Sequence, residues 1–470
     1  MKKVFVFCIG GTGMRVMKAV TMLMAAGMNT NGYAIVPILV DPHRDLDERK
    51  GLNTLLEDYR SIYRSTIKND SETLNPLDGF FATEMPRLKD LNNQQNDTDE
   101  MGGDERRFGD YIKANLSDDD PNKYLVQTLF SQKNLNSKLA VGFKGNPNVG
   151  TVVLSDMVEG ANWFKAFKDN FYEGDRVFII SSIFGGTGAS GYPLIEKKIR
   201  ESKDYPLLSQ ALLGAVTVLP YFSLEDPGVT NSDIDSTTFL TKAKSALAYY
   251  EDTVQSDYLY YAGEQTENWA TYANNEAEQK DKAHFIELVA ASALFDFLTR
   301  EKQDTNQYLS RAIRQNVSSL DKVSLGDAYN KIVKPLADFT LLCLLTKVLP
   351  DEKYFPLKKW RSMDDSFYHD NDFAKLCDFL GKFKGWYEDL ATNNRAFAPL
   401  YLDNEKDISG WIKRTSSNMK DVSYLLLEMI KASQAETEKH DNHIRHLLNF
   451  AHKAINSYTN VLIPEQIKLN

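Results

Sequence analysis

The sequence predicts an α/β fold, with a Rossmann-like parallel sheet in residues 1–300 and a mainly helical region in residues 301–470. Before residue 300, short apolar runs alternate with segments of helical spacing. Such runs are typical of strands that are buried on both faces, and the alternation indicates crossover helices between parallel strands. After residue 300 the apolar residues keep the helical period and strand signals are scarce. A chain of 470 residues, 42% of them hydrophobic, is long and apolar enough for two or three packed units.

Five apolar runs in the first part are interpreted as strands: Val4–Ile9, Ala34–Val40, Val177–Ile180, Leu212–Leu219 and Tyr258–Tyr261. Pro37 has no backbone N–H, so we expect the second run at the edge of the sheet. Helical spacing predicts helices over Met14–Ala26, Tyr192–Arg200 and Ala283–Arg300. The last of these has apolar residues over a broad face, so it should be buried on most sides.

A polar segment, roughly residues 45–140, separates the second strand from the third. It is rich in Asp, Asn, Gln and Lys, and we interpret it as an insertion with a few short helices and mobile loops. In the second part, the spacing predicts helices around Asp327–Val348, Phe373–Thr392, Asn418–Thr437 and Asn442–Tyr458. The insertion and these C-terminal helices are the expected surfaces for a protein partner.

The charge and cysteine content exclude several classes of protein. The 55 Lys and Arg residues against 65 Asp and Glu give a net charge of −10, which disfavours sequence-independent nucleic-acid binding. Cys8, Cys343 and Cys377 are far apart and form no CxxC pair, which excludes a disulfide scaffold and fits a reducing compartment. The most apolar downstream run, Leu336–Leu345, contains Asp338 and is too short to span a bilayer. We therefore expect a cytoplasmic protein without a transmembrane segment.

Two glycine clusters follow predicted strands and carry the strongest functional signal. The first glycine cluster is Gly10-Gly11-Thr12-Gly13, and the second runs from Gly185 to Gly191 with the sequence Gly-Gly-Thr-Gly-Ala-Ser-Gly. Glycine allows backbone N–H groups to approach an anion, and the free N–H groups and dipole of a following helix favour phosphate. Thr12, Thr187 and Ser190 would add hydroxyl donors. In open α/β sheets, ligands bind beyond the carboxyl ends of the strands.

These clusters match neither of the two commonest phosphate-binding patterns. No Gly-Lys-Ser/Thr follows either cluster, so neither is a P-loop, and the first cluster lacks the third glycine of a dinucleotide fingerprint. Asp41, after the second strand, could still take the place of the acid that binds a ribose. An NAD-dependent oxidoreductase is therefore one alternative. For each cluster taken singly, tight packing of a helix on a strand is an equally good explanation.

The content and order of these loops resemble those of the prokaryotic tubulin/FtsZ-like GTPases. Gly185–Ala189 fit the Gly-Gly-Thr-Gly signature of that family, with Ser190 where the last glycine usually stands. Lys144–Gly150, with the sequence Lys-Gly-Asn-Pro-Asn-Val-Gly, is similar to a phosphate loop of FtsZ, and Val218–Phe222 is similar to its Pro-Phe loop. Asp41 falls at the acid of the loop after the second strand, and Ala283–Arg300 resembles the long central helix. The resemblance covers residues 1–42 and 140–300.

The resemblance implies a protein that binds GTP or GDP, with Mg²⁺ held through the phosphates and not by protein side chains. It also implies GTP hydrolysis at a site completed between subunits, and head-to-tail self-association into a homo-oligomer or cytoskeletal filament. The residues that it assigns to the nucleotide are Gly10, Gly11, Thr12, Gly13, Met14, Arg15, Asp41, Gly145, Asn146, Gly150, Gly185, Gly186, Thr187, Gly188, Ala189, Ser190, Pro220 and His284.

Two positions depart from the family pattern. His284 stands where the family has an Asn that reads guanine, with Asn274 and Asn275 nearby. The acidic loop that follows the central helix in the family is not visible here, and the candidates for a catalytic acid are Asp304 with Asn306, or Asp321 and Asp327. The departures leave a second alternative open, a nucleotide-binding sensor or scaffold that does not hydrolyse its ligand.

Overall fold

The fold is taken from a computed structural model of the chain. It describes residues 1–42, 47–69, 71–91, 106–116, 120–139, 143, 145–225, 236–266, 269–272, 282–303, 305–310, 327–350, 366–392, 422–436 and 442–467. Lys144, Asn274, Asn275, Asp304 and Asp321, all named above, lie outside these residues.

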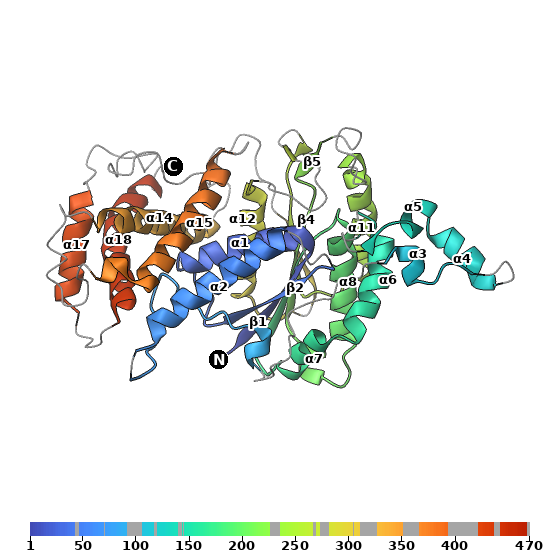
Figure 1. Ribbon diagram of the computed structural model, residues 1–470, viewed down its shortest axis with the longest axis horizontal. Coiled ribbons are helices and arrows are strands. Elements are labelled where there is room, and N and C mark those ends of the chain that lie inside the picture. Colours follow the sequence, from blue (N-terminus) through green and yellow to red (C-terminus); the bar gives the residue numbers. More distant parts are fainter. Residues whose placement is uncertain are drawn as a thin grey trace.

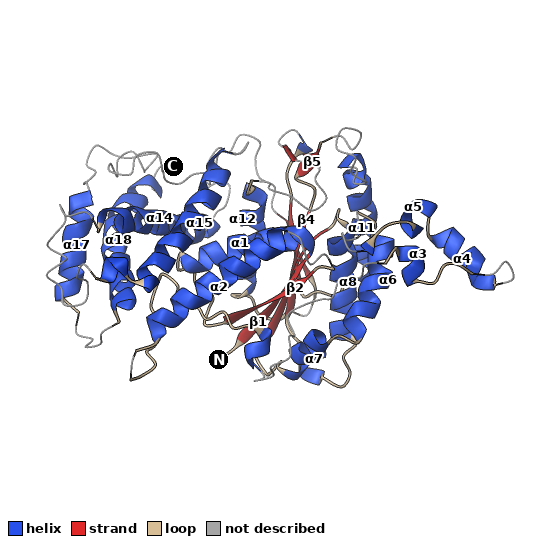
Figure 2. Cartoon of the chain, in the orientation of Figure 1, coloured by secondary structure: helices blue, strands red, loops and turns tan. Residues whose placement is uncertain are grey.

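A six-stranded sheet forms the centre of the molecule (Figure 2). Its strands are β1 (Lys3–Ile9), β2 (Ala34–Val40), β3 (Arg176–Ser182), β4 (Leu213–Val218), β6 (Tyr258–Ala262) and β8 (Gln307–Ser310). They lie in the order β2-β1-β3-β4-β6-β8, and every neighbouring pair is parallel. The α/β fold with a parallel sheet is confirmed, and β2 lies at the edge.

Pro37 fits this edge because of the alternation of N–H groups along β2. Ala34 donates its N–H inward to the carbonyl of Lys2, so the odd-numbered positions of the strand face away from β1. Ile35 accordingly donates outward, to the carbonyl of Glu84. Pro37 occupies the next outward position, where a missing N–H costs no bond to β1.

The expectation that strands are scarce after residue 300 missed β8. Its four residues, Gln307–Ser310, pair with β6 in parallel and extend the sheet beyond the predicted boundary. So short a segment is too brief to show a reliable alternation. A separate pair, β5 (Phe222–Leu224) and β7 (Ala270–Tyr272), lies beyond the main sheet.

Helices cover both faces of the sheet (Figure 1). On one face lie α1 (Gly10–Ala25) and α12 (Phe285–Phe297); on the other lie α6 (Pro147–Glu159), α7 (Asn162–Asp169), α8 (Gly186–Arg200) and α11 (Phe239–Thr253). The short α9 (Pro206–Ser209) follows α8. Both α1 and α8 start earlier than predicted, because the glycine clusters are themselves the first turns of these helices.

The insertion contains more regular structure than expected. Its first element, α2 (Asp47–Ile67), is a helix of 21 residues that packs on α1. Its buried residues recur at helical spacing among many charges, at Leu52, Leu55, Leu56, Tyr59, Ile62 and Tyr63. Three short helices follow, α3 (Phe108–Tyr111), α4 (Pro121–Leu129) and α5 (Gln132–Leu135), and they extend away from the sheet (Figure 1). Together with the short 3-10 helix η1 (Leu88–Leu91), these are the described elements that agree with the prediction of short helices.

The positions of the four predicted C-terminal helices are confirmed within the residues that the structure describes. They are α14 (Asp327–Val348), α15 (Asn371–Thr392), α17 (Val422–Gln434) and α18 (His443–Ile467). They gather at one end of the long axis, beside α2 and away from α3–α5 (Figure 1). Phe339, Phe379 and Phe383 pack with Phe81 between these helices and the α/β part, so both share one apolar core. In the described part of the chain, no helix is long and apolar enough to cross a membrane.

A buried cluster of polar residues connects α8 to the sheet. Arg200 donates to the Asp257 carboxylate at 3.0 Å, and the N–H of Gln255 donates to Glu196 at 3.0 Å. Burial raises the pKa of Glu196 to about 7, with the neighbouring Asp257 adding to the shift and Arg200 opposing it. The direction follows from the loss of hydration of the carboxylate, which the attraction of Arg200 offsets only in part.

Replacing Gly13 should destabilise the fold. A Cβ at this position would lie 2.8 Å from the carbonyl carbon of Cys8 and 2.9 Å from the carbonyl oxygen of Ile180. We expect Gly13→Ala to lower the free energy of unfolding by about 1–3 kcal/mol, because rigid backbone must move. Gly51→Ala, in α2 with open space around it, should raise that free energy by about 0.5–1 kcal/mol. Chemical denaturation measures both; equal effects would contradict the packing argument.

Glu196 should make stability depend on pH. Its pKa is higher in the folded chain than the ordinary value of 4.5, so the folded state binds more protons between these values. This contribution to stability is fully present below pH 4.5 and is lost as the pH rises to about 7. Glu196→Gln keeps an acceptor for the N–H of Gln255 but removes the titrating carboxyl group. In this variant, the midpoint temperature of thermal unfolding should therefore depend less on pH over that window than in the wild type. If the midpoint temperature of the variant depends on pH as strongly as that of the wild type, another group titrates in this window.

Candidate functional site

The two glycine clusters face each other between β1 and β3, where the order in which strands are added to the sheet changes direction. β1 has β2 on one side and β3 on the other, so α1 and α8 leave adjacent carboxyl ends and run on opposite faces. This is a topological switch point, the place where open α/β sheets bind ligands. A Cβ at Gly10, whose φ is 71°, would lie 3.4 Å from Thr187 Cβ and 3.5 Å from the backbone nitrogen of Gly188.

A third segment lies against the start of α8. The N–H of Asn146 donates to the carbonyl of Phe143, closing a turn whose third residue, Gly145, has a φ of 72°. A Cβ at Gly186 would lie 2.9 Å from Phe143 Cβ and 3.1 Å from the nitrogen of Gly145. Further along, Gly150 packs on Ser190. The first turns of α6 and α8 therefore run side by side.

These helix starts share an electrostatic property. The first turns of α1, α6 and α8 contain no acidic residue, and their N-cap residues make no side-chain capping bond. Asp120, Ser131 and His284 cap α4, α5 and α12, whereas α7, α9 and α11 also lack a side-chain cap and an acid in the first turn, so it is the meeting of three such starts that sets this place apart. A helix start carries free N–H groups and a partial positive charge. Three such starts at one edge of the sheet form a favourable environment for an anion with several charges.

The residues of the clusters divide between packing and exposure. Gly13 and Gly188 pack against strand backbone; a Cβ at Gly188 would lie 2.6 Å from the carbonyl oxygen of Ser182. Gly10, Gly186 and Thr187 are buried at the contacts given above, and Met14, Ala189 and Gly150 are buried in their helices. The Ser190 hydroxyl donates to the carbonyl of Gly186 at 2.7 Å, so its proton is used within α8. The partly exposed positions are Gly11, Thr12, Gly145, Asn146 and Gly185.

Asp41 belongs to the same place. It directly follows β2 and is buried, and its Oδ2 would lie 3.8 Å from a Cβ at Gly10. Arg49 holds this turn by donating to the backbone carbonyl of Asp41 at 3.0 Å. The structure thus brings together the first cluster, the second cluster, the segment 143–150 and Asp41, which are far apart in the sequence.

The start of α12 is organised differently from the glycine clusters. His284 is fully buried, and its Nδ1 accepts a hydrogen bond from the N–H of Ile286 at 3.1 Å. Glu287 accepts from the N–H of His284 at 3.1 Å, from Arg15 Nε at 2.6 Å and from the Tyr221 hydroxyl at 2.8 Å. Pro220, next to Tyr221, is also buried. Arg15 and His284 are therefore held in a network that joins α1 to α12.

The electrostatics of this network follow from burial. Burial, together with the adjacent Glu287, raises the pKa of Tyr221 well above its ordinary value. Tyr221 therefore stays a neutral hydroxyl that donates to Glu287. The Arg15 guanidinium also donates to the carbonyl of Lys282 at 2.6 Å and lies over the ring of Tyr272.

The candidates for a catalytic acid are not joined to this site by any described contact. Asp327 is the first residue of α14, and its side chain is not described; Asn306 immediately precedes β8. Within the described residues, no group of three His, Cys, Asp or Glu side chains could hold a metal ion.

Three side chains next to the predicted residues were given no role from the sequence; Glu287 was interpreted there as a solvated or ion-paired residue on the face of its helix. Glu287 and Tyr221 complete the network at α12, and Lys242 Nζ would lie 3.1 Å from a Cβ at Gly145. The capping pattern of His284 with Glu287 three residues later could have indicated the first of these. Lys242 lies on α11, remote from any glycine motif, and only the fold brings it close.

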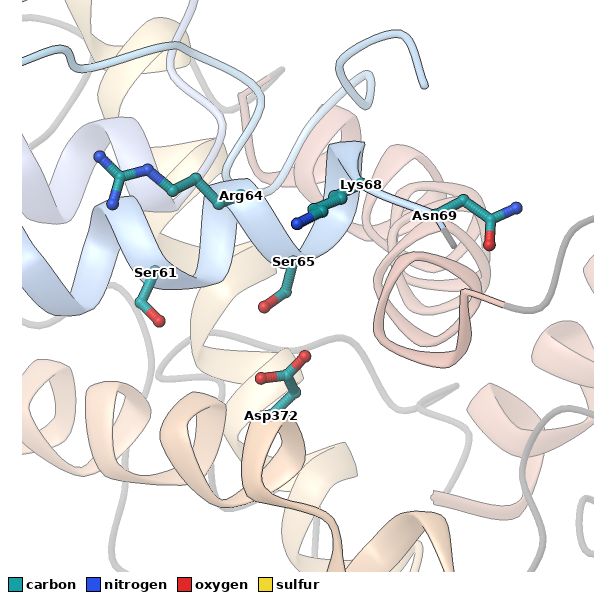
Figure 3. A pocket seen from close by; sticks show the side chains of 6 residues that line it. All are labelled: Ser61, Arg64, Ser65, Lys68, Asn69 and Asp372. Carbon is teal, nitrogen blue, oxygen red and sulfur yellow. The ribbon is translucent and has the colours of Figure 1, made fainter. Parts of the chain in front are cut away.

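A separate cavity of about 400 Å³ lies between α2 and α15 (Figure 3). Its lining consists of Ser61, Arg64, Ser65, Lys68, Asn69 and Asp372. In Figure 3, Ser61 and Ser65 point toward Asp372, whereas Arg64 and Asn69 point away from it. The charged groups do not converge on a common point, and the cavity shares no residue with the glycine clusters.

Comparison with known proteins adds no assignment to this site. No model of a protein family matches the chain, and no curated protein matches it.

Removing Arg15 should destabilise the link between α1 and α12. Arg15→Met leaves the Glu287 carboxylate buried without its cation, and we expect a loss of about 3–5 kcal/mol in the free energy of unfolding. Arg15→Met combined with Glu287→Met should cost less than Arg15→Met alone, because no unpaired charge remains. Arg64→Met, which removes an exposed pair with Asp90, should cost less than about 1 kcal/mol. Additive losses in the double variant would refute the coupling.

Proposed function

We propose that this chain is a GTP-binding protein of the tubulin/FtsZ type that binds its nucleotide at the switch point between β1 and β3. One observation carries the proposal. Three uncapped helix starts, from segments that resemble the family's loops in the family's order, lie together at the carboxyl edge of a parallel sheet. Tight packing explains a glycine cluster alone, but it does not require three segments to meet without a capping acid.

The charge balance of the chain supports backbone recognition of the phosphates. At a net charge of −10, the overall field repels a polyphosphate. N–H groups of Gly11 and Thr12 in α1 and of the first turn of α8 would supply local donors instead. Mg²⁺ favours phosphate oxygens, water and one or two carboxylates. The ion would be held through the phosphate oxygens, as the resemblance implies, and would neutralise their charge.

In the same proposal, GTP hydrolysis is completed between subunits. The described candidates for the acid of the family's catalytic loop, Asn306 and Asp327, make no described contact with the phosphate edge, so a residue of a second copy would position the attacking water. A head-to-tail contact of that kind builds open filaments unless it closes into a ring. Catalysis would then depend on protein concentration.

A nucleotide sensor that does not hydrolyse its ligand is the second candidate. The observation that favours it is a direct connection from the nucleotide part to the C-terminal helices. The N–H of Ala283 donates to Asp389 of α15 at 3.2 Å, and Lys282, which precedes α12, lies 3.4 Å from Thr392. A ligand-dependent movement of the α12 start would reach α15 through these bonds. An NAD-dependent oxidoreductase ranks third, because it leaves the second cluster and the segment 143–150 unexplained.

Nucleotide binding tests the proposal directly. Purified protein is titrated with GTP, ATP and NAD in the presence of Mg²⁺, and we expect GTP to bind most tightly. Gly186→Val should abolish this binding, because the new side chain would displace Phe143 and Gly145 from the start of α8. Gly160→Ala, at the end of α6 with open space around it, is the matched control and should bind as the wild type does.

Turnover and pelleting separate the candidates. Phosphate release that rises with protein concentration, together with GTP-dependent pelleting, supports the GTPase that assembles. GTP binding without turnover at any protein concentration supports the sensor. Binding of NAD alone, or unchanged GTP affinity in a folded Gly186→Val, contradicts the site.

A further inference from the structure

The helix α4 carries large apolar side chains on its surface and buries none of its nine residues. Tyr124, Leu125 and Leu129 are 70%, 56% and 54% exposed. Leu125 and Leu129 lie one turn apart, with Tyr124 beside Leu125, so the three form one apolar face. A helix this short is marginal by itself in water, and a cluster of exposed apolar side chains is typical of a surface that a partner covers.

The segment α3–α5, here called the arm, holds α4 on a fixed base. Phe108 is fully buried and packs on Phe130 at a ring distance of 4.8 Å. Its N–H donates to the carbonyl of Ser137 at 2.9 Å, which closes the arm, and the Tyr111 hydroxyl donates to Asp156 of α6. Figure 1 shows α4 extending from this base, away from the sheet. The apolar face of α4 is therefore a preformed surface.

The arm is basic around this face, although the chain as a whole is acidic. Residues 121–139 contain three lysines and no Asp or Glu, whereas the net charge of the chain is −10. Lys133 and Lys138 are exposed. Complementary charge selects partners at an interface, so the occupant of this face should be acidic. An anionic membrane is a poor candidate, because the chain as a whole would be repelled from it.

The end of α11 has the complementary character. Glu251 and Asp252 are exposed in its last turn, which contains no basic residue. Neither carboxylate has a hydrogen bond or an ion pair in the described part of the chain. Acidic groups at this end of a helix face its partial negative charge, so a cation from outside would stabilise them. Tyr249, 55% exposed in the same turn, adds apolar surface.

We propose that α4 of one copy packs on the acidic end of α11 of a second copy, with Lys133 and Lys138 against Glu251 and Asp252. Both surfaces are exposed within one chain, so the contact forms between copies. A stable interface buries about 1,200–2,000 Å² in total, of which one nine-residue helix supplies only a part. A two-fold dimer, in which each arm packs on the other copy, uses the pair of surfaces twice. This contact does not depend on a nucleotide.

Sedimentation velocity over a range of protein concentrations, without nucleotide, tests the apolar part of the contact. We expect the wild type to dimerise. Leu125→Gln combined with Leu129→Gln should weaken the dimer by more than about tenfold, because two buried apolar anchors are lost. Leu207→Gln combined with Leu427→Gln is the matched control, since both leucines are 54% exposed on other helices, and it should leave the dimer unchanged.

A charge reversal tests the pairing of the two surfaces. Lys133→Glu with Lys138→Glu should weaken the dimer, and so should Glu251→Lys with Asp252→Lys, because like charges then face each other. The variant that carries all four substitutions should recover dimerisation, since opposite charges face again. High salt should weaken the wild-type dimer by screening these pairs.

Three results would overturn the proposal: a wild type that is monomeric at every concentration, arm variants that dimerise as the wild type does, or a four-fold variant without recovery. Binding to vesicles of anionic phospholipid that requires Leu125 and Leu129 would assign α4 to a membrane instead and would also overturn it. The variants leave the glycine clusters intact, so GTP binding, measured in parallel, reports separately on the proposed function. Thermal unfolding establishes that each variant is folded.

Discussion

The close approach of two helix starts to strand backbone is the constraint on which the rest of the structure depends. Gly13 of α1 lies against Cys8 and Ile180, and Gly188 of α8 lies against Ser182, at distances that a side chain would not allow. These contacts set where each helix leaves the sheet. Because β1 and β3 are adjacent and parallel, they also force the two first turns to meet, which creates the candidate site.

Backbone and side chains have different roles at the helix starts of the phosphate edge and at the start of α12. At the phosphate edge, the helix starts are left without capping side chains, and backbone N–H groups are the available donors. At the start of α12 the opposite holds, since His284, Glu287, Arg15 and Tyr221 satisfy one another. The first region is open to an anion, whereas the second is a structural joint between α1 and α12.

Much of the fold was predictable from the sequence, because buried parallel strands such as Val4–Ile9 are short, apolar and flanked by glycine. The clusters at Gly10 and Gly185 were visible for the same reason: strand, glycine turn and helix are local patterns. The contacts of Lys242 and Tyr221, and that of Glu287 with Arg15, were not visible, since they join segments far apart in the chain and depend on packing. The helix α2 was missed because its many surface charges obscured the buried stripe that includes Leu52 and Tyr59.

The edge strand β2 limits how copies of this chain could join. A strand edge recruits another strand through its outward N–H and carbonyl groups. Here Ile35 has already donated its outward N–H to Glu84, and Pro37 has none to offer. A foreign strand would find no regular ladder at this edge, so pairing that extends the sheet between molecules is blocked there. Any assembly of the protein on this side would have to use contacts between side chains. Such contacts select their partner, whereas backbone hydrogen bonds between strands do not.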